Sequence, residues 1–228
     1  MRTLLILFTI TISNMLYAQV ITDKEKANVL RMREEEKMAR DVYMLMNDKW
    51  DHQVFSHISE SEIYHMSQMK LWVDKFSLDD PVTRNNDKRG VFTDQSLQKL
   101  YNELAASGLQ SKEAAFRAGA KVEEVDILDL KAALSETSNA GLQSTYKYLI
   151  HASENHLRAF VRNLKALGID YKPVVMDQKE FDEIIKGQGG GMGMGTSGAV
   201  NRPEAMNRHM NSRSSGSPNG AGSGLNGS

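Results

Sequence analysis

The chain has 228 residues, with 28 lysine and arginine residues against 29 aspartate and glutamate residues, and no cysteine. A net charge near zero gives no electrostatic reason to expect nucleic acid as a partner. The lack of cysteine excludes disulfide scaffolds, thiolate metal sites and cysteine nucleophiles. Any bound metal must therefore be held by histidine, carboxylate or backbone oxygen.

Residues 1–18 have the pattern of a cleavable signal peptide. Arg2 precedes an apolar run over residues 4–12, and a polar break then leads to the small residue Ala18. The run is roughly half of the ~20 residues that a membrane-spanning helix needs, which favours export over a membrane anchor. We expect cleavage after Ala18, a secreted or periplasmic mature protein, and no stable membrane insertion after cleavage.

Residues 187–228 form a tail rich in glycine, serine, asparagine and methionine. The tail has almost no large aliphatic residues, so its burial would not offset the entropy of ordering it, and we expect it to be disordered. Its methionines and His209 could bind copper(I), although a plain polar tail is the simpler interpretation. Residues 19–186 remain as one folded domain.

Within this domain, apolar residues recur at a spacing of three to four, and no segment alternates with period two. The pattern predicts helices over residues 23–49 and 53–76, a shorter one from Thr93 to Gly108, one from Ser111 to about residue 139, and one over 142–167. A final turn is expected near residues 181–185. Four long helices with a long connection in the middle predict an all-α four-helix bundle whose crossover contains a short extra helix.

Carboxylates occur on helical stripes that otherwise face the core. Glu36 shares a stripe with Met32, Ala39 and Tyr43. One of the three glutamates at positions 34–36 is therefore expected to point inward, with Glu36 best placed. The alternative interpretation is that residues 34–37 form a solvated charge run.

Two further helices carry candidate metal ligands. Glu62 and His65 are three residues apart, so their side chains emerge on one helical face and could share one metal ion. In the helix after Ser111, Glu123 lies on the apolar stripe, Glu124 is the alternative inward residue, and Asp126 lies three positions after Glu123.

The last long helix adds His156, which lines up with its apolar residues and is also compatible with simple packing. Together the four helices offer a glutamate, a Glu-x-x-His pair, a second glutamate and a histidine. Ferritin-like bundles hold a di-iron or di-manganese pair with a similar set. Carboxylate and imidazole ligands without thiolates suit Fe(II) or Mn(II) better than structural zinc.

Several motifs occur in a specific order over about residues 29–167. They are EEEKMARDVY at residues 34–43, SExxH at 61–65, GVFT at 90–93, VEExDIxDL at 122–130 and NHLRAF at 155–160. They resemble the ferritin-like family catalogued as domain of unknown function 2202. The resemblance implies that two iron or manganese ions are held by Glu36, Glu62, His65, Glu123 (or Glu124) and His156.

The sequence departs from the full di-iron pattern at Ser153, three residues before His156, where a second Glu-x-x-His would have its carboxylate. Asp126 could take this place from the neighbouring helix. Otherwise one of the two metal positions is weak and open.

The leading hypothesis is a di-metal oxidoreductase that reacts with O₂ or peroxide, such as a ferroxidase, with Tyr43 as a candidate catalytic neighbour of the site. The alternatives are a non-catalytic secreted binding or structural module and a metal-sequestering protein. An oligomer is compatible with the sequence.

Overall fold

The structure is a computed structural model that describes residues 21–187. The expected signal peptide and nearly all of the expected tail lie outside the described residues. Residues 21–187 contain seven helices and no strand, which confirms the all-α expectation. The helices are α1 (Asp23–Trp50), α2 (Gln53–Lys75), α3 (Pro81–Arg84), α4 (Gln95–Gly108), α5 (Lys112–Ser135), α6 (Ala140–Ala166) and α7 (Gln178–Lys186).

The helix ends follow local capping chemistry. Thr22 and Glu25 form a capping box at the start of α1, in which each residue accepts a hydrogen bond from the backbone N–H of the other. The start of α4 is one residue later than expected, because Asp94 rather than Thr93 caps it. The end of α5 is earlier than expected, because the chain turns after Ser135 and Asn139 caps α6.

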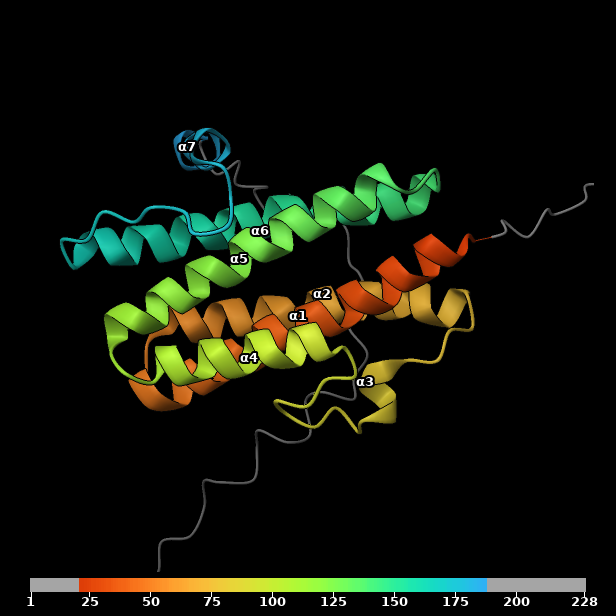
Figure 1. Ribbon diagram of the computed structural model, residues 1–228, viewed down its shortest axis with the longest axis horizontal. Helices are drawn as coiled ribbons and strands as arrows, with labels where there is room; N and C mark the ends of the chain where they lie inside the picture. Colours follow the sequence, from red (N-terminus) through yellow and green to blue (C-terminus); the bar gives the residue numbers. More distant parts are fainter. Residues whose placement is uncertain (1–20, 188–228) are drawn as a thin grey trace, which may run out of the picture. The chain divides into compact units, whose positions relative to one another are not determined.

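The four long helices pack as two pairs (Figure 1). α1 lies along α2 and α5 lies along α6, while contacts of α1 with α5 and of α2 with α6 join the pairs. The chain passes from the first pair to the second through α3 and α4, and α4 lies beside α1 and α5. The buried faces of these helices form two apolar clusters along the interior.

The second pair packs closely because α5 carries a small residue where α6 approaches. A Cβ atom at Gly119 would lie 2.5 Å from the ring of Phe160, which is too close for any side chain. Phe160 also packs against Tyr43 and Phe55, with ring centroids 5.2 and 5.7 Å apart. This aromatic cluster fills the interior next to the candidate ligands.

The middle of α1 is buried on every side, which contradicts the solvated charge run. Every residue from 32 to 43 is buried, because the crossover covers the outer face of α1. Glu34 accepts hydrogen bonds from the backbone N–H groups of Thr93 and Asp94 at 2.6 and 2.9 Å. The buried ammonium group of Lys37 lies 2.6 Å from Asp41, which also accepts from the N–H of Gly90 at 2.9 Å. All three glutamates at positions 34–36 are therefore buried, not one.

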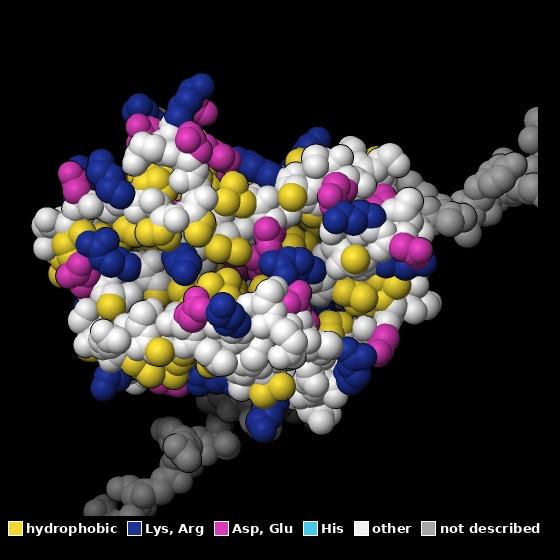
Figure 2. All heavy atoms as spheres, in the orientation of Figure 1, with side chains coloured by type: hydrophobic (Ala, Val, Ile, Leu, Met, Phe, Trp, Pro, Cys, Tyr) yellow, Lys and Arg dark blue, Asp and Glu magenta, His cyan; other side chains and the backbone are white. Residues whose placement is uncertain are grey.

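Within residues 21–187, no helix combines the length and the apolar character that crossing a membrane requires. On the face that carries α4 and α5, basic, acidic and apolar side chains are interspersed (Figure 2). Such a mixture is typical of an ordinary solvated surface.

Candidate metal centre

Four helices contribute the five candidate ligands. Glu36 comes from α1, Glu62 and His65 from α2, Glu123 from α5 and His156 from α6. The three glutamates and His65 are at most 2% exposed, and the His156 side chain is 12% exposed. The helical period places each of them on an inward stripe, so the packing of the two helix pairs brings them together.

The ligands form two groups that share Glu62. Glu36, Glu62 and His65 make one group and Glu62, Glu123 and His156 the other, each with its ligand atoms within 4.8 Å of one another. His65 Nδ1 lies 2.7 Å from Glu62 Oε2 and 3.2 Å from Glu36 Oε2. His156 Nδ1 lies 3.0 Å from Glu62 Oε1 and 3.6 Å from Glu123 Oε2. Glu62 thus presents one oxygen to each imidazole, and these two triads could hold two metal ions side by side.

Burial and close charges shift the pKa values of these groups. Burial raises the pKa of Glu36 to about 7, although His65 opposes this. Burial acts the same way on Glu62, but the imidazoles of His65 and His156 outweigh it and hold its pKa well below the ordinary range. Burial disfavours a charged His156, yet Glu62 and Glu123 raise its pKa to about 10. Glu62 and Glu36 likewise raise the pKa of His65 well above its ordinary value, against the effect of burial. Without a metal ion, the centre would therefore hold protons on its imidazoles.

The donor set fits a divalent cation in place of those protons. Glu36 Oε1 and Asp126 Oδ1 are buried and have no hydrogen-bond partner within residues 21–187. Buried polar atoms are normally satisfied, so unpartnered ones in a cluster indicate a missing ligand. Three carboxylates and two imidazoles give hard oxygen and nitrogen ligands, as Fe(II) and Mn(II) prefer.

Tyr43 is fully buried beside the second triad. Its hydroxyl donates a short hydrogen bond to Glu123 Oε1. Burial and the negative charges of Glu123 and Glu62 raise the pKa of Tyr43 well above its ordinary value. The phenol therefore keeps its proton and contacts Glu123 at the edge of the second triad, and a catalytic role for Tyr43 stays a prediction.

Glu124, the alternative to Glu123, points to a different part of the chain. Its carboxylate accepts a hydrogen bond from the hydroxyl of Tyr171 at 2.7 Å. It also accepts from the backbone N–H groups of three consecutive residues, Val174, Val175 and Met176, at 2.8–2.9 Å. Glu124 therefore fastens the segment between α6 and α7, and of the two neighbours only Glu123 joins a triad.

Asp126 and Glu35 complete the set of buried carboxylates around the centre. Asp126 lies in neither triad and accepts a hydrogen bond from Ser153 Oγ at 2.5 Å. Glu35 is fully buried, and its nearest ion-pair partner is Arg31 at 3.8 Å. The helical period favoured Glu36 among the three glutamates, and the burial of Glu35 could not be predicted because it depends on packing against distant segments.

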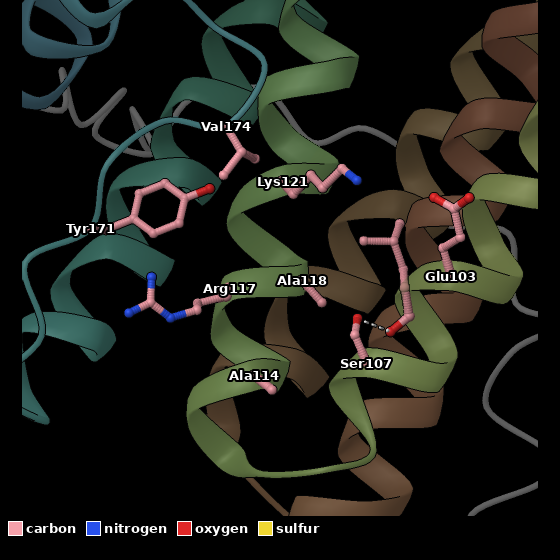
Figure 3. Close-up of a pocket in the computed structure, with 9 residues that line it drawn as sticks. Glu103, Ser107, Ala114, Arg117, Ala118, Lys121, Tyr171 and Val174 are labelled. Atoms are coloured by element: carbon pink, nitrogen blue, oxygen red, sulfur yellow. Dashed lines mark hydrogen bonds between the residues drawn. The ribbon is translucent and has the colours of Figure 1, made fainter.

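A separate groove lies on the outer side of α5, between α4 and the segment after α6 (Figure 3). Its volume is about 350 Å³. Arg117, Lys121, Tyr171 and Val174 are among the residues that line it, and none of the candidate ligands does. The groove is therefore distinct from the candidate metal centre.

Comparisons with known proteins agree with the motif resemblance. Residues 25–188 match the family described as "Uncharacterized protein domain (DUF2202)". The chain is 41% identical over 167 residues to uncharacterized protein MJ0754 of Methanocaldococcus jannaschii, which covers 73% of this chain and 89% of that protein. The crystal structure of hypothetical protein MJ0754 is similar, with a TM-score of 0.72 and 40% identity over 75% of this chain and 96% of the other. The chain belongs to the DUF2202 family.

Proposed function

We propose that this protein is an exported ferritin-like protein that holds two iron or manganese ions and reacts with O₂ or peroxide. The observation that carries the proposal is the pair of buried Glu/His triads with Glu62 in common. A carboxylate shared by two ligand groups is how a di-metal carboxylate protein places its ions side by side.

The helix arrangement supports a ferritin-like bundle. Two helix pairs joined by a long crossover give that fold its connectivity, and here α3 and α4 lie in the crossover between the α1–α2 pair and the α5–α6 pair. The ligand order along the chain is also that of a ferritin-like centre, except at Ser153.

The chain would hold one ion with Glu36, Glu62 and His65 and the other with Glu62, Glu123 and His156. Two such ions would together supply the two electrons that reduce O₂ to peroxide or peroxide to water. Burial of the ligands keeps bulk water out, and Tyr43 orients Glu123 through its hydrogen bond. His156 is the most exposed of the five ligands, so a small reactant would approach on its side.

Export is part of the proposal. It rests on the signal-peptide pattern of residues 1–18. In that setting the protein would meet metal ions and oxidants outside the cytoplasm.

A second candidate function is metal sequestration or a structural role without turnover, and Ser153 favours it. A serine where a ferritin-like centre has a carboxylate lowers the negative charge that stabilises two oxidised metal ions. Such a protein would bind metal without consuming an oxidant.

Oxidant consumption by protein loaded anaerobically with Fe(II) separates the two functions. We expect saturable consumption of O₂ or peroxide by the wild type over many equivalents of added Fe(II). His156→Ala should slow it by more than about tenfold, since one triad loses its imidazole. Glu60→Gln, an exposed change on the same helix as Glu62, should leave it unchanged. Stoichiometric Fe(II) binding without turnover would instead establish the second function.

A further inference from the structure

The α5–α6 interface repeats one cross-helix contact a turn apart. Glu123 on α5 faces His156 on α6, with Oε2 and Nδ1 3.6 Å apart. Three residues further along α5, Asp126 faces Ser153, which lies three residues before His156 on α6. At two successive helical turns, a carboxylate of α5 therefore faces a side chain of α6.

The Asp126–Ser153 pair is fully enclosed and tightly spaced. Ser153 is 1% and Asp126 4% exposed, and the hydroxyl of Ser153 lies 2.5 Å from Asp126 Oδ2. The same hydroxyl also lies 3.0 Å from the carbonyl oxygen of Leu149. Ser153 therefore fixes the orientation of the Asp126 carboxylate through one of its oxygens.

The other oxygen of Asp126 is left without a partner. Asp126 Oδ1 is buried and makes no hydrogen bond, and Glu36 Oε1 is in the same situation. Burial raises the pKa of Asp126 well above its ordinary value, with further contributions from the negative charges of Glu36, Glu35 and Glu123. Asp126 is thus a buried carboxylate that is affected by the charge of one member of each triad, Glu36 and Glu123, and that forms no ion pair within residues 21–187.

The first triad lacks ligands on this side of the bundle. Glu36, Glu62 and His65 come only from α1 and α2, and Mn(II) held by oxygen ligands prefers about six of them. Glu35 also has unpartnered oxygens, but Arg31 lies 3.8 Å from it and pairs with Asp129. Glu35 therefore has a cationic side chain nearby, whereas Asp126 has no ion-pair partner among the described residues.

We infer that Asp126, held in place by Ser153, supplies the carboxylate that completes the Glu36–Glu62–His65 position from the α5 side. The carboxylate that a ferritin-like centre would take from α6 at position 153 is provided instead by α5. This inference rests on the proposed two-metal centre. It assigns Ser153 the role of a positioning residue, so the serine does not by itself leave a metal position open.

Manganese binding tests the inference without any redox step. Free Mn(II) gives an electron paramagnetic resonance signal that is lost on binding, so a titration yields the number of ions per chain and their affinities. We expect two ions for the wild type. Asp126→Asn keeps the shape of the side chain and should lower the affinity for one of the two ions by at least about tenfold. Ser153→Ala should lower the affinity for the same ion by a smaller factor. Asp129→Asn, the same change one turn along α5 on a half-buried residue, should bind as the wild type does.

A swap variant distinguishes ligation from structural support. Asp126→Ser with Ser153→Glu returns the carboxylate to α6 and should restore the second ion to within about threefold of the wild type. Circular dichroism of each metal-free variant verifies folding, and the swap and Ser153→Ala remain informative if Asp126→Asn does not fold. If Asp126→Asn binds as many Mn(II) ions as the wild type, with the same affinities, the inference is wrong, while the proposal that the two triads hold metal is unaffected. A wild type that binds no manganese or iron would instead overturn the proposed function.

Discussion

Glu62→Gln will remove both metal ions from the protein, whereas His65→Ala and His156→Ala will each remove one. Glu62 presents Oε2 to His65 at 2.7 Å and Oε1 to His156 at 3.0 Å, so its carboxylate belongs to both triads. Even outer partners of metal ligands typically cost about 10- to 100-fold in affinity when they are lost. Loss of a shared ligand should therefore lower the affinity for each ion by more than about 100-fold.

The measurement is metal per chain by mass spectrometry after equilibration with Mn(II) and gel filtration. Glu60→Gln is the matched control, because it makes the same chemical change on an exposed position of α2. If the two ions were bound at independent sites, the Glu62→Gln variant would keep one ion. That result would contradict the shared role of Glu62.

The metal-free protein will become less stable as the pH rises from about 4.5 to 10, and bound metal will reverse this trend. Glu36 has a pKa of about 7 in the folded protein, above its ordinary 4.5, and His156 has one of about 10, above its ordinary 6.5. For a raised pKa the stabilising contribution is fully present below the unfolded value and is lost as the pH passes the folded value. The two groups therefore act in the same direction across this window, with an effect on the order of a few kcal/mol. Glu62, whose pKa is lowered, loses its contribution only below about pH 4.5.

Metal ions bound at the two triads would take the place of these protons, so their stabilising effect should grow with pH. At a free metal concentration of 100 times the dissociation constant, one site contributes about 2.7 kcal/mol, or roughly 5–10 °C in a domain of this size. Thermal unfolding with EDTA or with Mn(II) between pH 5 and 8 measures both trends. Glu36→Gln should flatten the EDTA curve between pH 5 and 7. Rising stability in EDTA over that range, or a manganese shift that is independent of pH, would contradict the account.

The sequence predicts the main helices well because their apolar periodicity is strong and their caps are local. α1 and α2 each end within one residue of the expected positions. The same periodicity places Glu36 on the inward stripe with Met32 and Ala39. Glu36 could therefore be predicted as the metal ligand among three consecutive glutamates. Errors occur where the chain turns, as at the start of α4 and the end of α5.

The sequence could not show which distant segment covers each helix. The burial of Glu34 and Asp41 depends on hydrogen bonds to the crossover, 49 to 60 residues away. Glu124 is likewise occupied by a segment some 50 residues further along the chain. Helical periodicity reports one face of one helix, so it favoured Glu123 as the inward residue but could not show what buries Glu124. It also could not predict that Asp126 is paired with Ser153.

Anomalous diffraction from crystals of the wild type grown with Mn(II) and, separately, with Fe(II) will locate bound metal ions directly. If the two triads hold metal, the maps will contain two peaks per chain in the interior, one at Glu36, Glu62 and His65 and one at Glu62, Glu123 and His156, with Glu62 contacting both. An empty centre at saturating metal, or a single ion that Glu62 does not contact, would contradict the proposed two-metal centre.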